Sequence, residues 1–160
     1  MRRADDDQNG VPTDEPGGFN DLLGLCVVEW NAERAVVELT LEEKHLNRSG
    51  NVHGGVLSAL LDNALSLAGL YCPVPGNARR AVTLSLSTTF VSPAKQGVLR
   101  CVGVLRGGGR KIYMTSAEVV DEQGRLVAMG EGSFKRLSGS ESPDGVPISL
   151  LKERLKGHRE

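Results

Sequence analysis

Residues 51–70 read NVHGGVLSALLDNALSLAGL, and from Val56 onward leucine, alanine or valine stands at most positions. A helix that is apolar on nearly every side is normally surrounded by the rest of its domain. At ~1.5 Å per residue, a helix from Gly54 to Leu70 would be about 25 Å long, which is enough to cross a small domain. The stretch therefore predicts one long buried helix around which the rest of the chain is arranged.

The polar residues of this helix follow a regular spacing. Ser58, Asp62 and Ser66 are four residues apart, so they share one narrow stripe, with Asn63 beside them. An ionised carboxylate is costly to bury without partners. Asp62 is therefore either a structural acid, satisfied by a neighbouring hydroxyl or backbone group, or a functional one.

Strand patterns lie on both sides of the predicted helix. Before it, residues 25–30 and 34–41 form a predicted hairpin, and the polar segment 42–51 is predicted to be a loop. After a cluster of prolines and glycine that ends the helix, four further strands are predicted, at residues 82–90, 98–105, 111–120 and 125–136. Short turns join these four strands, which predicts an antiparallel meander. The sequence thus predicts an α+β fold in which about six antiparallel strands curl around one helix.

The two ends of the chain differ in composition from this central part. Residues 1–17 are polar and are predicted to be a disordered tail. Residues 18–137 are expected to form one domain, which begins with a short helix capped by Asn20. Residues 138–160 are expected to be a second tail, in which residues 148–156 have a weak amphipathic helical spacing.

The composition excludes several classes of function. With 19 basic and 20 acidic residues, the chain of 160 residues has no net charge that would attract nucleic acid. No apolar run reaches the roughly 18 to 20 residues of a membrane span, and the N-terminus lacks the apolar core of a signal peptide, so we expect a cytoplasmic protein. The three cysteines match neither a disulfide framework nor a zinc site. We expect no metal or redox cofactor.

Several motifs together resemble a known family. Asn47 lies six residues before the run His53-Gly54-Gly55, Asp62 lies nine residues after His53, and Thr83 and Ser92-Pro93-Ala94 follow. This combination resembles the acyl-CoA thioesterases of the phenylacetate-pathway (PaaI-like) type, within the 4-hydroxybenzoyl-CoA thioesterase superfamily, which have the hotdog fold. The resemblance covers roughly residues 20–136 and leaves out both tails.

The resemblance implies a subunit arrangement that the sequence alone does not show. In this family two subunits join their sheets into one continuous sheet, and the dimers often pair again into tetramers. The active sites lie at the dimer interface. Asn47, His53 and Gly54 would then come from one subunit, and Asp62 and Thr83 from the other.

The helix N-terminus and Asp62 are the central candidates for catalysis. Unpaired backbone N–H groups and the positive end of the helix dipole gather at Gly54 and Gly55, so the Gly54 N–H could stabilise charge on a thioester oxygen. The alternative is that the two glycines only allow a tight turn into the helix. Asp62 could attack the thioester carbonyl or deprotonate an attacking water, and the sequence leaves these two roles open.

Three further residues are lesser candidates. Asn47 could hold the attacking water or the substrate carbonyl. Thr83 could orient the carboxylate of Asp62 or the water, although threonine is also common on any strand face. His53 is expected to order its loop by hydrogen bonding rather than to act as a base.

A glycine-rich basic run, residues 106–111, separates two predicted strands. Successive N–H groups in such turns bind anions, and flanking cations suit phosphates. The resemblance places the phosphates of coenzyme A near this junction, so Arg110 and Lys111 are candidate nucleotide-binding residues, with Arg80 of the Arg79-Arg80 pair as a weaker one. The alternative is a solvated hairpin turn.

The sequence favours hydrolysis of an acyl-CoA thioester to a free acid and coenzyme A. One alternative is a protein of the same fold that binds acyl-CoA without turnover, although such a protein would not need Asp62. Another is a hydratase or dehydratase acting on acyl thioesters, but the sequence context of the histidine and acid differs. The identity of the acyl group, and the choice between dimer and tetramer, stay open.

Overall fold

The computed structural model describes residues 18–151. The elements follow in the order α1 (Phe19–Leu23), β1 (Cys26–Trp30), β2 (Arg34–Thr40), the 3₁₀ helix η1 (Glu43–His45), α2 (Gly54–Ala68), β3 (Asn77–Ala78), β4 (Ala81–Phe90), β5 (Val98–Gly108), β6 (Ile112–Val120), β7 (Leu126–Arg136) and β8 (Val146–Pro147). The predicted long helix and the six predicted strands are confirmed. Asn20 is not the cap of the first helix, because α1 begins after Gly18 and Asn20 lies within it.

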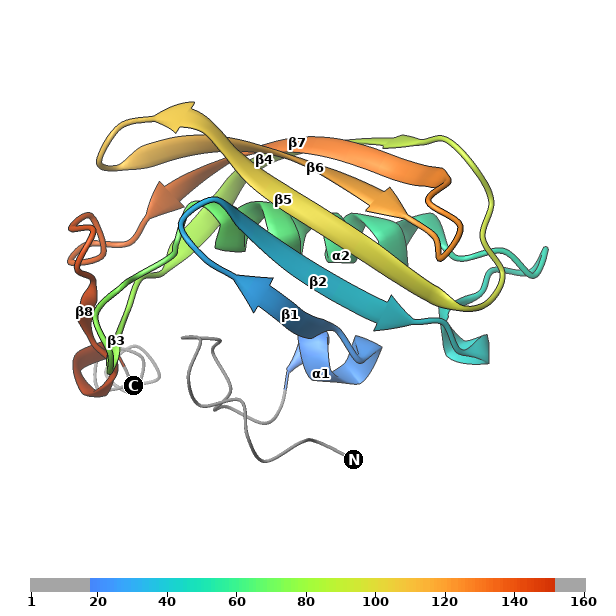
Figure 1. Cartoon of the computed structure of the whole chain (residues 1–160), viewed down its shortest axis with the longest axis horizontal. Coiled ribbons are helices and arrows are strands. Elements are labelled where there is room, and N and C mark those ends of the chain that lie inside the picture. Colours follow the sequence, from blue (N-terminus) through green and yellow to red (C-terminus); the bar gives the residue numbers. More distant parts are fainter. Residues whose placement is uncertain (1–17, 152–160) are drawn as a thin grey trace.

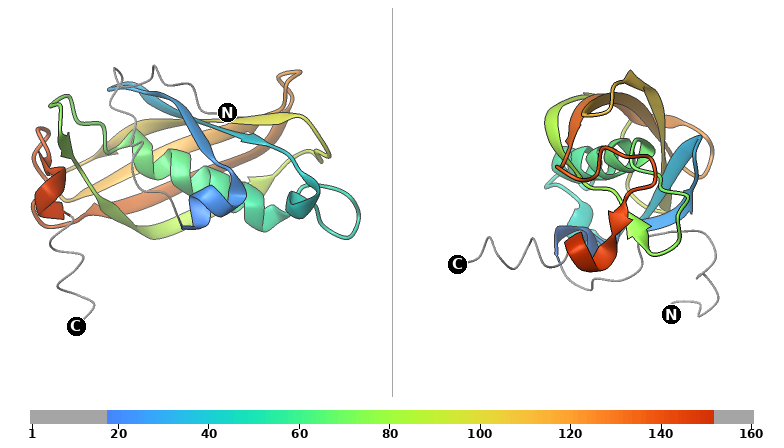
Figure 2. Two further views of the ribbon diagram at one scale, coloured as in Figure 1. Left: turned by 90° about the horizontal axis from the view of Figure 1, so that it is seen from below. Right: turned by 90° about the vertical axis from the view of Figure 1, so that its left-hand side faces the viewer.

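One six-stranded antiparallel sheet, in the order β1-β2-β5-β6-β7-β4, wraps around α2 (Figure 1). Seen end-on, the strands curl around the helix (Figure 2), which is the arrangement of the hotdog fold. The core forms between α2 and the inner face of the sheet, with Leu60, Leu61 and Leu65 of the helix among its fully buried side chains. Between residues 18 and 151, no helix combines the length and apolar character that a membrane crossing requires.

The predicted meander of four strands is wrong at its first step. Strands β5, β6 and β7 do pair in succession, but β4 pairs with β7 and lies three positions away from β5. Three strand spacings amount to about 14 Å, and the seven residues 91–97 can span about 23 Å. This connection therefore crosses the end of the sheet. It is held there because the N–H of Val91 donates to the carbonyl of Val127 and the carbonyl of Ala94 accepts from the N–H of Val52.

Contrary to the expectation from its apolar sequence, the described residues do not cover helix α2 on every side. Ser58, Asp62 and Ser66 are half-buried, as is the neighbouring Asn63. Strand β4 is also open, because it is the edge strand and its apolar side chains Leu84 and Phe90 are 52% and 54% exposed. Residues 18–151 of the single chain thus leave one side of the helix and the neighbouring edge strand uncovered.

Side chains from the sheet satisfy the carbonyl groups at the C-terminal end of α2. The indole N–H of Trp30 donates to Leu67 O at 2.9 Å, and the hydroxyl of Tyr113 donates to Ser66 O at 2.8 Å. Arg136 is a buried residue, 6% exposed, and its guanidinium donates to Gly69 O at 2.8 Å and lies over the Tyr113 ring. Burial raises the pKa of Tyr113 to about 12, so its hydroxyl keeps its proton. These three contacts fix the end of the helix against the sheet.

The described part of the C-terminal segment lies against the chain that follows α2. Strand β8 pairs with β3, and Ser140 and Leu151 are buried. Residues 148–151 are helical, in agreement with the first part of the helix expected over residues 148–156. Residues 152–156, like the N-terminal tail 1–17, lie outside the described residues.

We predict that Gly103→Ala destabilises the protein by about 1 to 3 kcal/mol. A methyl group at this position of β5 would overlap the backbone carbonyl of Ala64 in α2, so helix and sheet would have to separate. Chemical denaturation monitored by circular dichroism measures the change. Gly107→Ala is the matched control, since a methyl group there meets no atom within 4 Å; equal stability of the two variants would contradict the prediction.

Candidate active site

Among the described residues, one backbone N–H at the N-terminus of α2 has no acceptor. The Nδ1 atom of His53 accepts the N–H of Gly55 at 2.9 Å, and the carbonyl of His53 accepts the N–H groups of Val56 and Leu57. The N–H of Gly54 has no acceptor within residues 18–151. Since Nδ1 of His53 accepts a hydrogen bond, it carries no proton in this arrangement. The contact supports the expectation that His53 orders the loop, and it leaves Gly54 as the available donor.

Gly54 lies beside a small hollow of about 320 Å³. The hollow is lined by Asn47, Val52, Gly54, Leu57, Phe90, Val91, Ser92 and Pro93. The ring of Phe90 packs against Gly54 so closely that a Cβ atom there would lie 3.1 Å from its Cζ. Glycine thus lets the backbone and the aromatic ring approach each other beside the free N–H.

Asn47 lines the same hollow, and its side chain already has one set of partners. Its Oδ1 atom accepts the N–H groups of Ser49 at 2.9 Å and Asn51 at 3.2 Å. The amide Nδ2 has no acceptor within the described chain. Asn47 therefore holds the loop with its oxygen and presents its amide N–H groups as further donors near Gly54.

Asp62 and Thr83 meet at the middle of the helix. The hydroxyl of Thr83 donates to Oδ1 of Asp62 at 2.8 Å. Asp62 is half-buried, and no hydrogen bond joins its carboxylate to Ser58 or Ser66 in the structure. Ser58 instead donates to the carbonyl of Gly54. Ser58 and Ser66 therefore do not satisfy Asp62, whereas the hydroxyl of Thr83 does, a contact that fits a structural as well as a functional carboxylate.

A β-bulge turns Thr83 toward the helix. In the pairing of β4 with β7, the register shifts between Thr83 and Ser85. Thr83 pairs with the buried Phe134, whereas Ser85 pairs with Ser133 and exchanges a hydrogen bond of 2.7 Å with it on the outer face. In an unbroken strand Thr83 and Ser85 would share one face. The bulge places them on opposite faces. The regular alternation of apolar and polar residues in this strand did not indicate the bulge.

The structure does not bring all the candidate residues of one chain together. Gly54 and Asp62 are eight residues apart on α2, which corresponds to about 12 Å along the helix axis. Gly54 and Asn47 form one group, and Asp62 and Thr83 form another. A single thioester carbonyl cannot contact both groups of the same chain.

The basic hairpin between β5 and β6 lies at the opposite end of the molecule from Gly54, beyond the C-terminus of α2 (Figure 1). Arg110 and Lys111 are exposed there, and no acid forms an ion pair with either among the described residues. Arg136 holds this hairpin by donating to Gly109 O at 2.8 Å and to Arg110 O at 3.2 Å. Arg80 is half-buried, and its carbonyl accepts the N–H of Leu137.

Sequence reasoning missed Arg136, the residue that joins the hairpin to the helix. Arg136 is the last residue of the predicted strand 125–136, and the residues next to it match no functional motif. Burial and the nearby Arg79 lower its pKa, and no acid forms an ion pair with it in the described chain. Its donors instead meet three backbone carbonyls. Only the fold could show these partners, because they come from two segments distant in sequence.

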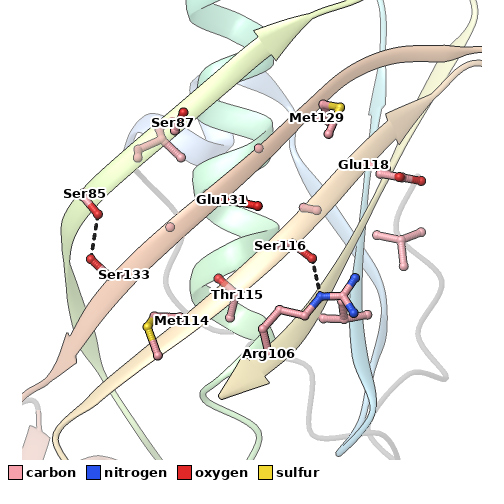
Figure 3. A pocket seen from close by; sticks show the side chains of 16 residues that line it. Ser85, Ser87, Arg106, Met114, Thr115, Ser116, Glu118, Met129, Glu131 and Ser133 are labelled. Atoms are coloured by element: carbon pink, nitrogen blue, oxygen red, sulfur yellow. Dashed lines mark hydrogen bonds between the residues drawn. The ribbon is translucent and has the colours of Figure 1, made fainter. Parts of the chain in front are cut away.

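A larger hollow of about 910 Å³ lies on the outer face of the sheet, away from α2 (Figure 3). Methionines and serines of β4, β6 and β7 line it, and Arg106 crosses it to donate to Ser116 at 2.6 Å. None of the candidate catalytic residues lines this hollow. Its size alone does not make it the site of chemistry.

Comparisons with known proteins identify the family. The model of the thioesterase superfamily matches residues 49–128. Human acyl-coenzyme A thioesterase 13 is 31% identical over 116 residues, which cover 70% of this chain and 80% of that protein. The acyl-coenzyme A thioesterase PaaI of Escherichia coli is 29% identical over 134 residues, which cover 83% of this chain and 92% of PaaI.

A solved structure agrees with these matches. The E. coli PaaI protein from the phenylacetic acid degradation operon superposes with a TM-score of 0.66 and 27% identity, over 76% of this chain and 85% of that one. The resemblance to PaaI-like thioesterases of hotdog fold is confirmed. The chain belongs to the thioesterase superfamily.

Proposed function

We propose that this protein hydrolyses an acyl-CoA thioester to a free carboxylic acid and coenzyme A. The observation that carries the proposal is the hydrogen bond from Thr83 to Asp62, which holds a carboxylate on the half-buried polar stripe of a mostly apolar helix. The names of the relatives, acyl-coenzyme A thioesterase 13 and PaaI, support the same reaction. The proposed reaction uses no cofactor, because coenzyme A is part of the substrate.

The site is proposed to form between two copies of the chain. Gly54 and Asn47 of one copy would face Asp62 and Thr83 of the other, which removes the separation of about 12 Å within one helix. Strand β4 offers the edge for such pairing, since within residues 18–151 it pairs with β7 alone and its exposed side chains include Leu84 and Phe90. An uncovered apolar edge strand is a ready template for another strand. Pairing of the dimers into a tetramer is a further expectation from the family.

In the proposed reaction the Gly54 N–H and the positive end of the α2 dipole stabilise negative charge on the thioester oxygen. The Thr83 hydroxyl donates a hydrogen bond to Oδ1 of Asp62. Oδ2 of the same carboxylate is therefore the oxygen that reacts in this proposal. It either attacks the carbonyl carbon, forming an anhydride that water then hydrolyses, or removes a proton from water that attacks directly. In both cases the carbon–sulfur bond breaks and the leaving thiolate takes up a proton.

The nucleotide part of coenzyme A is proposed to bind at the basic hairpin. Within residues 18–151, Arg110 and Lys111 have no ion-pair partner, and Arg136 fixes the backbone that carries them. Arg80 lies next to this region through the contact of its carbonyl with Leu137. Free cations on a fixed turn suit the phosphates of the nucleotide.

We predict that Asp62→Asn lowers kcat by at least about a hundredfold, because an amide can neither attack nor accept the proton. Thiol release from a panel of aromatic and aliphatic acyl-CoAs measures the effect and ranks the substrates. Size-exclusion chromatography checks that the oligomer is unchanged. Near-normal kcat in the variant would contradict the role of Asp62. Tight acyl-CoA binding without thiol release by the wild type would instead favour a binding protein.

Thr83→Val is expected to lower kcat by roughly tenfold and to leave KM nearly unchanged, because the hydrogen bond that orients Asp62 is lost while the size of the side chain is kept. Thr83→Ser keeps the hydroxyl and serves as the matched control. Steady-state kinetics with one good substrate measure kcat and KM for both variants. If valine and serine at this position had equal kcat values, the hydrogen bond would have no role in turnover.

Arg110→Ala is expected to raise KM for an acyl-CoA by about fivefold, through loss of one charge-assisted contact to phosphate. The same variant should leave the KM for the corresponding acyl-pantetheine unchanged, since that thioester lacks the nucleotide. Parallel kinetics with the two substrates test this. Equal effects on both would argue against a nucleotide site at the hairpin.

A further inference from the structure

The turn that follows β7 lies against the basic hairpin. The N–H of Arg136 donates to Lys111 O at 2.7 Å, and the N–H of Leu137 donates to Arg80 O at 2.8 Å. The next N–H contact, from Ser140 to Leu137 O, closes the turn. The chain that leaves the sheet is thereby held between the hairpin and the segment that leads into β4.

Glu141 ends this turn with a carboxylate in a fixed position. The N–H of Gly139 donates to its Oε2 atom at 2.7 Å. The backbone around it is tied down as well, because the Arg79 guanidinium donates to Ser140 O at 3.1 Å and to Glu141 O at 3.5 Å. Both the carboxylate and its backbone are therefore anchored.

Glu141 is the only acid in a group of five cations. Segments 79–80, 109–111 and 136–141 contain Arg79, Arg80, Arg110, Lys111 and Arg136, and among these three segments Glu141 alone is acidic. Backbone N–H groups and, beyond them, the charges of Lys111 and Arg110 hold the pKa of Glu141 below its usual value. The carboxylate is thus charged at neutral pH. No ion pair within 4 Å joins it to either cation in the described chain, so both remain open to a ligand.

We propose that Glu141 limits the affinity of the hairpin for coenzyme A and so favours release of the product. This inference rests on the proposed function and adds to it a residue that touches neither the thioester nor Asp62. A carboxylate beside a phosphate site repels the phosphates and offsets part of the attraction of the cations. The substrate and the coenzyme A product carry the same nucleotide. An acid at this place therefore weakens the binding of both, and the released product leaves faster.

The test is Glu141→Gln, which removes the charge but keeps an oxygen to accept the N–H of Gly139. Isothermal titration at low salt measures Kd for coenzyme A and for adenosine 3′,5′-bisphosphate. We expect both to bind about fivefold more tightly to the variant, with a smaller gain at high salt. The matched control is Glu118→Gln, an exposed acid of β6 seven residues from Lys111 and thus about 23 Å along the strand. Unchanged or weaker binding by Glu141→Gln, or an equal gain in the control, overturns the inference.

A second variant shows whether Glu141 acts through the hairpin. When Arg110 and Lys111 are both replaced by alanine, Glu141→Gln should no longer tighten binding, and a persisting gain overturns the inference. The proposed function fails separately. A wild type that releases no thiol from acyl-CoA and binds neither probe overturns both, whereas a wild type that hydrolyses acyl-CoA while Glu141→Gln leaves Kd and KM unchanged overturns the inference alone.

Discussion

When helix α2 is buried against a curved sheet, the backbone N–H and carbonyl groups at its two ends need hydrogen-bond partners. A helix leaves its first N–H groups and last carbonyls without partners, and these are costly to bury unpaired. At the C-terminal end the sheet supplies such partners. The side chains of Trp30, Tyr113 and Arg136 donate hydrogen bonds to the carbonyls of Leu67, Ser66 and Gly69, respectively. The sheet is thereby joined to the helix at one end by directional contacts as well as by its apolar core.

At the N-terminal end of α2 one backbone group is left without such a partner among the described residues, and this group forms part of the candidate site. His53 satisfies the N–H of Gly55, while the N–H of Gly54 finds no acceptor among the described residues and lies beside a hollow. A free donor at the positive end of a helix dipole is suited to a developing negative charge. The C-terminal end, which is anchored to the sheet by these hydrogen bonds, and the N-terminal end belong to the same helix. The fold therefore fixes the position of the Gly54 N–H.

The edge position of β4 connects the fold to the proposed dimer. Because the connection 91–97 crosses the end of the sheet, β4 pairs with β7, and no other strand of the described chain pairs with its second side. The bulge in the same strand turns Thr83 to Asp62. One strand therefore orients the carboxylate and offers the edge along which a second copy would bring its own Gly54.

The sequence was sufficient to predict local features. The long helix and the six strands follow from apolar periodicity, because this pattern reflects the geometry of a single element. Motif spacing made Gly54 and Asp62 candidates for catalysis. Strand order, the bulge and the partners of Arg136 could not be predicted. They depend on contacts between segments far apart in the chain, such as Arg136 with Gly69 and Gly109, for which one sequence contains no local signal. The tertiary structure alone revealed that Thr83 donates to Asp62, because a β-bulge in a strand from another part of the chain turns this hydroxyl toward the helix.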